Sequence, residues 1–290
     1  MERFDNFEFN KNDVLGHGAF AIVYKGRYAD KKEIPVAIKV IQKKHFPRAK
    51  AQSEDKKISL LEKEIKILKE LANLKHENLV SLLRCHEVSN AVYLVMEYCN
   101  AGDLADYLNE KTTLPETTIQ HFLRHMACAI EAIYKMGIVH RDLKPQNMLL
   151  CNPTGKSDPD PLDFIVKLAD FGFARFLEDG VMAATLCGSP MYMAPEVSVA
   201  QKRIFGHWKV LMSHKYCAKA DLWSLGTIIF QCLSSKPPFH AATPNELRDL
   251  YEMNRNLEPK IPAGCNPLLR DLLFRLLKRD AKDRIEFGAF

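Results

Sequence analysis

The chain has 290 residues, of which 47% are apolar and 27% charged, and its 41 basic and 36 acidic side chains give a net charge of +5. This balance excludes a collagen-like, coiled-coil or wholly disordered protein, and the charge is too small to indicate a committed nucleic-acid binder. Apolar runs such as Leu225–Leu233 are far too short to span a membrane, and the start Met1–Asn6 is unlike a signal peptide. The eight cysteines form no C-x-x-C pair, so we expect reduced thiols in the cytosol.

The first hundred residues predict a strand-rich half with one helix. Runs rich in β-branched and aromatic residues, bounded by Gly, Asn, Asp or Lys, predict strands at Phe7–Val14, Ile22–Tyr28, Pro35–Ile41, Leu79–Glu87 and Ala91–Met96. Apolar residues spaced by three and four predict a helix over Ser53–Leu74. A short joint near residues 97–102 ends this half.

The rest of the chain has a helical pattern. Thr113 and Glu116 form a T-x-x-E capping box, which predicts a helix from Thr113 to Gly137. Thr243 and Glu246 repeat that signature, with proline at the first helical position. We therefore expect an α+β fold in which a small strand-rich part precedes a larger helical part.

A glycine-containing segment, Gly16–Val23, lies between two predicted strands. Its two glycines would let the main chain approach a phosphate, but an ordinary hairpin turn has the same pattern, and Ala21 stands where a third glycine is usual. The next predicted strand ends in Val36–Lys39, whose lysine is by itself an ordinary edge charge.

A third residue, Glu64, favours a phosphate-binding role for the glycine segment and Lys39. It lies on the apolar stripe of the predicted helix, where a carboxylate is costly unless it is paired. Lys39 is the available cation, and a Lys–Glu pair beside a glycine loop holds phosphates. The alternative is a partly exposed Glu64 without this role.

Three further motifs follow in the second half, at His140–Asn147, Asp170–Gly172 and Ala194–Glu196. They match H-R-D-L-x-x-x-N, D-F-G and A-P-E of the protein-kinase signature set, in the expected order after the glycine loop and the strand lysine. Each motif alone occurs by chance, whereas the ordered set does not. The chain thus resembles a eukaryotic protein kinase over essentially all its length.

The resemblance is stronger to one branch, the autophagy-initiating ULK/Atg-type serine/threonine kinases. The segments that carry it are Gly16–Ala21, Glu64–Leu71, Val95–Leu108 and Met182–Glu196. It implies the bilobal protein-kinase fold as a single domain over residues 1–290, with an N-lobe at 1–98 and a C-lobe at 99–290.

The resemblance also implies transfer of phosphate from Mg·ATP to a protein hydroxyl. Asp142 would accept the hydrogen bond of the hydroxyl, and Lys144 would neutralise charge at the γ-phosphate. Asn147 and Asp170 are hard oxygen ligands suited to Mg²⁺, and Lys39 would hold the α- and β-phosphates.

The residues expected at the ATP site are Leu15, Gly16, His17, Gly18, Ala19, Phe20, Ala21, Ile22, Val23, Ala37, Lys39, Met96, Glu97, Cys99 and Leu149. Among them, Val23, Ala37 and Leu149 would sandwich the adenine. Main-chain groups of Glu97 to Cys99 would meet its edge, and Met96 would limit the depth of the pocket.

Other residues have structural or regulatory roles by the same resemblance. Asp221 would hold the main chain of His140 and Arg141, and Glu196 would form a buried ion pair with Arg284. Simple core packing is the alternative for each, and both can hold together.

Thr185 matches the activation-loop phosphosite of the family. Its phosphate would pair with Arg141 and Arg175 and order the loop, and the alternative is an unmodified threonine.

The substrate preference also follows from the resemblance. Lys144 and Gly188–Pro190 resemble the serine/threonine pattern rather than the tyrosine pattern. Gln146 stands where arginine-selecting kinases often carry Glu, and only Asp103 is acidic near the expected substrate groove. We therefore expect apolar residues, not arginine, around the target residue.

Two departures from the family stand out. Thirteen residues, Ser198–Val210, intervene after the A-P-E motif and are basic and aromatic. They are either a lineage-specific loop or a translated intron in the gene sequence, with a slight preference for the second. The chain also stops at Ile285–Phe290, which indicates either a fragment or an incomplete closing helix that would lower stability.

The branch resemblance implies a cytoplasmic kinase that starts autophagy and is recruited to autophagosome-forming membranes. Its protein partners would be subunits of the initiation complex, bound through a C-terminal tail that this chain lacks. Two alternatives stay open: a pseudokinase that binds nucleotide as a scaffold, and an active kinase of another pathway.

Overall fold

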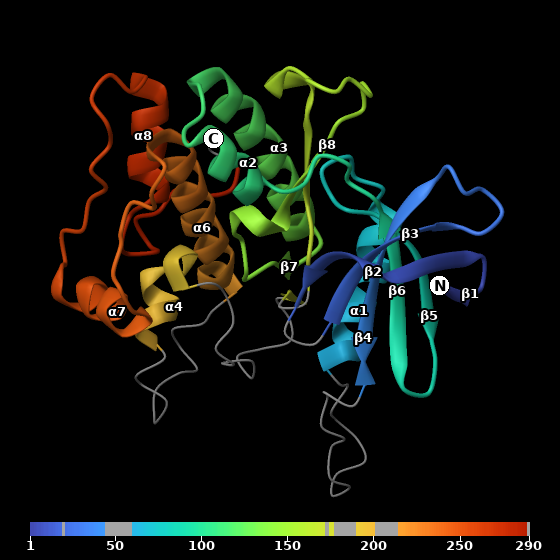
Figure 1. The fold of residues 1–290 in the computed structure, drawn as a ribbon. Helices are drawn as coiled ribbons and strands as arrows, with labels where there is room; N and C mark the ends of the chain where they lie inside the picture. Colours follow the sequence, from blue (N-terminus) through green and yellow to red (C-terminus); the bar gives the residue numbers. More distant parts are fainter. Residues whose placement is uncertain (19–20, 44–59, 172–173, 177–189, 201–213, 289–290) are drawn as a thin grey trace, which may run out of the picture. The chain divides into compact units, whose positions relative to one another are not determined.

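Figure 1 shows the computed structural model, which describes residues 1–18, 21–43, 60–171, 174–176, 190–200 and 214–288. The chain divides into two compact units, Met1–Asn100 and Ala101–Phe290. Each unit is described by itself below.

The first unit is a six-stranded antiparallel sheet in the order β1-β2-β3-β4-β6-β5, with one helix in its described part (Figure 1). Its elements are β1 (Glu2–Phe4), β2 (Phe7–His17), β3 (Ala21–Tyr28), β4 (Pro35–Gln42), α1 (Leu60–Leu74), β5 (Leu82–Glu87) and β6 (Ala91–Glu97). The five predicted strands are present, with ends that differ by a few residues. The predicted helix ends at Leu74 as expected, while the first part of its predicted range, residues 53–59, lies outside the described residues.

The two faces of β4 show why this unit folds as it does. Side chains alternate between the faces of a strand, and Val36, Ile38 and Val40 are buried in a cluster with aromatic residues of β2 and β3. The intervening residues, Ala37 and Lys39, therefore lie on the opposite face of the sheet.

Strand β1 is not predicted from the sequence, in which the first residues are only a polar stretch. Asp5, with φ of 45°, turns the chain back so that Phe4 lies opposite Phe7. The Phe4 ring lies 4.5 Å from the ring of Tyr93 between centroids. Aromatic packing across the sheet holds β1 in place. A strand of three residues is too short for its sequence pattern to predict this packing.

The second unit is mostly helical in its described part. Its helices are α2 (Leu104–Lys111), α3 (Glu116–Lys135), α4 (Pro195–Ala200), α6 (His214–Ser234), α7 (Pro244–Met253) and α8 (Pro267–Leu276), with short 3₁₀ helices at Pro145–Asn147, Pro161–Asp163 and Pro190–Tyr192. Four short strands form two antiparallel pairs, β7 (Ile138–Val139) with β10 (Arg175–Phe176) and β8 (Met148–Cys151) with β9 (Ile165–Leu168).

Helix α6 runs through the core of this unit, between α3 and α8 (Figure 1). Every residue from Asp221 to Phe230 is buried, as expected for a helix that is apolar nearly all round. The helix begins at His214, before this apolar run, and Ala218 and Lys219 are also buried. No helix in the described part of the chain has the length and apolarity needed to cross a membrane.

One of the two predicted capping boxes is wrong. Helix α3 begins at Glu116 with Pro115 at its N-cap, and Thr113 makes no cap. The carboxylate that would close the box instead accepts the main-chain N–H of Asn266 at 2.9 Å. At α7 the N-cap half of the prediction is confirmed, because the Thr243 side chain accepts the main-chain N–H of Glu246. The Glu246 carboxylate does not close the box on Thr243 but accepts the main-chain N–H of Ala242 at 3.1 Å.

Helix α4 overlaps the start of the thirteen-residue segment Ser198–Val210. Its last three residues are the first three of that segment, and the buried Ser198 donates its main-chain N–H to the carbonyl oxygen of Ala194 at 2.9 Å. Residues 201–210 lie outside the described part, and both interpretations of the segment stay open.

Gly226 marks the closest approach of α6 to α8, so Gly226→Ala is expected to destabilise the protein. An added Cβ would lie 2.9 Å from Cβ of Leu276 and 3.1 Å from the side chain of Leu277. Overpacking costs about 1–3 kcal/mol, which outweighs the gain of about 1 kcal/mol in helix propensity. Urea unfolding should show a lower midpoint, and an unchanged or higher midpoint would contradict this packing.

Candidate active site

The loop between β7 and β8 gathers the predicted catalytic side chains of the second unit. Asp142 is only 3% exposed, and its Oδ2 lies 2.8 Å from Nζ of Lys144. The amide nitrogen of Asn147 donates to the carbonyl oxygen of Asp142 at 2.7 Å and to Oδ2 at 3.3 Å. The Asp142 carboxylate is thus held between a cation and an amide donor.

Asn147 also connects this loop to Asp170, the other predicted metal ligand. Its carbonyl oxygen accepts the main-chain N–H of Ala169 at 2.9 Å, directly before Asp170. Asp170 has φ of 59°, a conformation that a residue other than glycine adopts only when its surroundings hold it there. An amide and a carboxylate offer the hard oxygen atoms that Mg²⁺ prefers, so these residues fit a divalent cation. Within the described residues, no cluster of three or more His, Cys, Asp and Glu forms a metal site of its own.

His140 holds the same two segments together from inside the core. It is fully buried, its Nδ1 accepts the main-chain N–H of Asp142 at 3.3 Å, and its Nε2 lies 3.0 Å from the carbonyl oxygen of Ala169. These partners require the neutral tautomer with hydrogen on Nε2. The His140 ring also makes an edge contact with the Phe171 ring, with 5.1 Å between the ring centroids. His140 therefore fixes the distance between the catalytic loop and the start of D-F-G.

Asp221 of α6 holds the turn from which the loop departs. Its two carboxylate oxygens accept the main-chain N–H groups of His140 at 2.8 Å and of Arg141 at 2.9 Å, as predicted. Arg141 has φ of 71°, so this carboxylate stabilises a strained turn. Burial raises the pKa of Asp221, while the main-chain N–H donors of His140 and Arg141 and the positive charge of Arg141 act to lower it.

Asp221→Asn is expected to lower the free energy of unfolding by about 1–3 kcal/mol, because one of the two N–H groups would then face an amide NH₂ instead of an acceptor. Urea unfolding measures this difference. Asp249→Asn, which changes an exposed acid on α7, is the matched control and should have little effect. Equal stability of the two variants would contradict the role of Asp221.

The predicted phosphosite Thr185 lies outside the described residues. Arg175 of β10 is paired with Val139 of β7, and Arg141 follows Val139 by two positions along the chain. The side chain of Arg175 also lies outside the described part, so the pairing of Thr185 with both arginines stays a prediction.

In the first unit, the glycine segment forms the hairpin between β2 and β3. Gly16 is paired with Val23 and His17 with Ile22, and Gly18 donates its main-chain N–H to the carbonyl oxygen of Ala21 at 2.8 Å. Ala19 and Phe20 lie outside the described residues. A Cβ added to Gly16 would meet no atom within 4 Å, so space above the hairpin is open at this position within the described part.

The strand pairing puts four of the predicted ATP-site residues on one face of the sheet. Ala37 lies opposite Met96, and Lys39 lies opposite Val23. Directly paired residues share a face, and so do residues two apart in one strand. The side chain of Glu64 lies outside the described part, so its pairing with Lys39 stays a prediction.

Other predicted ATP-site residues lie in strands β2, β6 and β8 or, for Cys99, just after β6. Leu15 is 45% exposed in β2, and Cys99 is buried. Glu97 exchanges main-chain and side-chain hydrogen bonds with Ser81, at 3.0 and 2.7 Å. In the second unit, Leu149 of β8 is paired with Lys167.

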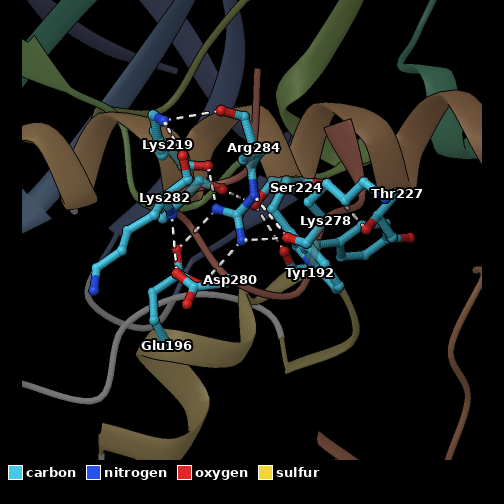
Figure 2. Close-up of polar contacts among 11 residues, drawn as sticks. Tyr192, Glu196, Lys219, Ser224, Thr227, Lys278, Asp280, Lys282 and Arg284 are labelled. Atoms are coloured by element: carbon cyan, nitrogen blue, oxygen red, sulfur yellow. Dashed lines mark hydrogen bonds and ion pairs between the residues drawn. The ribbon is translucent and has the colours of Figure 1, made fainter. Parts of the chain in front are cut away.

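Glu196 and Arg284 form the predicted ion pair (Figure 2). The two guanidinium nitrogens Nη1 and Nη2 donate to Oε1 and Oε2 of Glu196 at 2.8 and 3.1 Å. The Arg284 side chain is fully buried, whereas that of Glu196 is 20% exposed. This bidentate pair attaches the first turn of α4 to the segment after α8.

Sequence reasoning missed the polar contacts that α6 makes with Tyr192, just before α4. Ser224 donates its hydroxyl to the carbonyl oxygen of Tyr192 at 2.7 Å, and the Tyr192 hydroxyl donates to Gln231 at 2.8 Å. Burial raises the pKa of Tyr192 to about 12, so the hydroxyl keeps its proton. The one available signal was the presence of polar residues, Ser224 among them and the buried Lys219, in an otherwise apolar helix.

Comparison with known proteins agrees with this geometry. Residues 9–289 match the family described as protein kinase domain, and the chain belongs to that family. Its fold is accordingly the α+β, bilobal protein-kinase fold, and members of this family use ATP with a divalent metal.

Individual relatives place the chain within the family. It is 62% identical over 290 residues to the serine/threonine-protein kinase unc-51 of Caenorhabditis elegans, and 53% identical over 289 residues to the serine/threonine-protein kinase ULK1 of Homo sapiens. It is 35% identical over 308 residues to the serine/threonine-protein kinase atg1 of Schizosaccharomyces pombe. These alignments cover 100%, 100% and 95% of this chain but only 31%, 25% and 34% of the respective relatives. The resemblance to ULK/Atg-type serine/threonine kinases is thus confirmed.

Proposed function

We propose that this chain is the catalytic domain of an active serine/threonine kinase, with an N-lobe at 1–98 and a C-lobe at 99–290. The observation that supports this best is the arrangement of Asp142, Lys144 and Asn147, tied through Ala169 to Asp170. It combines a buried carboxylate, a neighbouring cation and oxygen ligands for a metal, which are the parts that phosphoryl transfer requires.

In this proposal each residue of the loop has one task. Asp142 orients the substrate hydroxyl and accepts its proton, and its buried carboxylate is held for this by Asn147. Lys144 offers positive charge to the transferring phosphate. Asn147 and Asp170 would hold Mg²⁺, which when bound supplies charge neutralisation between the phosphates.

The first unit is proposed to bind the nucleotide. Lys39 would hold the α- and β-phosphates with the help of Glu64, and the Gly16–Gly18 main chain would lie over the phosphates. Val23 and Ala37, which share the face of Lys39, would contact the adenine.

The protein substrate is proposed to lie along the segment Pro190–Glu196. This segment continues Gly188–Pro190, which has the serine/threonine pattern, and its main chain is fastened to α6 through Ser224 and to Arg284 through Glu196. Its exposed residue Met191 is compatible with apolar residues around the target.

Transfer of phosphate from Mg·ATP to a serine peptide with apolar flanks tests this function. We expect transfer to serine and threonine but not to the same peptide with tyrosine, and no dominant preference for arginine in a peptide array. Binding of ATP without transfer would contradict an active kinase and favour the pseudokinase alternative.

We also propose that the full-length protein starts autophagy. The supporting observation is the identity to unc-51 and ULK1 over the whole of this chain. A longer protein would bind initiation-complex subunits through a C-terminal tail and act in the cytoplasm at autophagosome-forming membranes. Depletion of the protein should reduce autophagosome number, and normal autophagosome formation would favour a kinase of another pathway.

Thr185 is proposed as the regulatory phosphosite. A phosphate adds about −1.5 to −2 charges, which Arg141 and Arg175 could pair. Thr185→Ala should lower transfer activity, and full activity of that variant would contradict the switch.

A further inference from the structure

Lys219 is a buried lysine that none of the kinase motifs uses. It lies on α6, and its side chain is only 6% exposed. A buried ammonium group is costly unless each of its N–H groups has an acceptor. Its contacts therefore need a structural explanation.

All three acceptors of Lys219 belong to one short stretch after α8, of which Figure 2 labels Lys282 and Arg284. Its Nζ lies 2.8 Å from the carbonyl oxygen of Arg284, 3.4 Å from that of Lys282 and 2.9 Å from Oε1 of Glu286. An ammonium has three N–H donors, so this stretch satisfies the whole group. Two of the three acceptors are main-chain atoms, which means that Lys219 fixes the path of the chain there.

The contact is reciprocal. Nη1 of Arg284 donates to the carbonyl oxygen of Lys219 at 2.6 Å, while Lys219 donates to the carbonyl oxygen of Arg284. Each side chain thus holds the main chain of the other residue. The remaining donors of Arg284 reach Glu196 and the carbonyl oxygen of Lys278, so the direction of the guanidinium depends on where Lys219 holds its main chain.

The same stretch of α6 contacts the segment Pro190–Glu196, which runs into the first turn of α4. Ser224, just over one turn beyond Lys219, donates to the carbonyl oxygen of Tyr192, and Arg284 holds the other end of the segment through Glu196. In the described part of the chain, no hydrogen bond or ion pair joins Lys219 to the segment Pro190–Glu196 or to the loop His140–Asn147. The polar contacts of Lys219 lead to that segment through Arg284.

We propose that Lys219 is a positioning residue of this kinase: through its reciprocal contact with Arg284 it fixes Glu196 and thereby the protein-substrate segment Pro190–Glu196. The inference rests on the proposed function for the role of that segment. It does not extend to ATP, because Asp142 and Asn147 are held by contacts that do not involve Lys219.

The test compares Lys219→Met with Glu286→Gln in two activities. The matched control Glu286→Gln removes only the charge at the exposed acceptor, whose side chain is 55% exposed, and leaves the two main-chain acceptors of Lys219. Loss of a hydrogen bond to a charged group predicts a fall of about tenfold or more in kcat/KM for the peptide in Lys219→Met. The KM for ATP and the basal ATP hydrolysis should change less than about twofold, and Glu286→Gln should resemble wild type.

A second measurement is independent of activity. In α4, the main-chain N–H groups of Val197 and Ser198 both donate to the carbonyl oxygen of Ala194. In α3, the main-chain N–H of Ile119 donates to the carbonyl oxygen of Pro115. In Lys219→Met we expect faster hydrogen exchange at Val197 and Ser198, with unchanged exchange at Ile119.

Three results would overturn the inference. The first is a proportional loss of peptide transfer and ATP hydrolysis in Lys219→Met, with faster exchange at Val197, Ser198 and Ile119. The second is no change in either activity or exchange. The third is that Glu286→Gln has the same effect as Lys219→Met. If Lys219→Met does not accumulate as a folded protein, Lys219→Gln, which keeps an N–H donor without the charge, is measured in the same way. If the wild-type chain transfers no phosphate, the proposed kinase function fails by itself, and the exchange at Val197 and Ser198 still decides the link from Lys219 to α4.

Discussion

Asp142→Asn is expected to lower the rate of phosphate transfer by about 10²–10⁴-fold, the usual contribution of a positioned general base. The carboxylate is 3% exposed and already placed by Lys144 and Asn147. An amide of the same shape keeps the packing but cannot accept the substrate proton, and its NH₂ group would face the Lys144 ammonium. Single-turnover transfer to the serine peptide measures the loss.

ATP binding separates this loss from unfolding. Asp142→Asn should bind ATP with an affinity close to wild type, because the proposed nucleotide contacts lie on Lys39 and the Gly16–Gly18 hairpin. Asp158→Asn, a change of an exposed acid in the loop between β8 and β9, is the control and should retain full transfer. Transfer by Asp142→Asn at the wild-type rate would remove Asp142 from the mechanism.

Arg284→Met is expected to lower the free energy of unfolding by about 3–5 kcal/mol, because it breaks a buried ion pair from one side. Its guanidinium is fully buried and donates to Glu196 and to the carbonyl oxygens of Lys219 and Lys278, as Figure 2 shows. It also lies over the Trp223 ring at 5.2 Å from the ring centroid. Methionine fills part of the volume but leaves three acceptors without these donors.

The chain contains a matched control for this prediction. Arg275 and Asp271 form an exposed ion pair on α8, at 3.5 Å and with side chains 47% and 66% exposed. Arg275→Met should cost at most about 0.5 kcal/mol, since exposed helical pairs contribute little. Urea unfolding of both variants gives the comparison. Equal costs would show that burial of Arg284 does not determine its contribution.

The outcome at the two predicted capping boxes shows where local patterns suffice. Thr243 caps α7 because both partners of its capping contact lie within one turn of the chain. Thr113 has the same local pattern and makes no cap, because the Glu116 carboxylate is taken by Asn266, 150 positions further along the sequence. A pattern of four residues cannot contain a competitor that distant.

The sequence by itself determined the family, the division into a strand-rich first part and a helical second part, and the candidate catalytic residues. These follow from short segments such as His140–Asn147 and Asp170–Gly172, in which the chemistry requires certain residue types at fixed spacing. The alternation along β4 and the apolar run of α6 likewise follow from local period. Such features need no knowledge of distant contacts.

Only the tertiary structure decided which polar groups meet inside the second unit. The reciprocal contact of Lys219 with Arg284 joins residues 65 positions apart, and Ser224 reaches back 32 positions to the carbonyl oxygen of Tyr192. The physical reason is that a buried charge or main-chain N–H must find a partner, but the partner is set by the packing of helices and not by spacing along the chain.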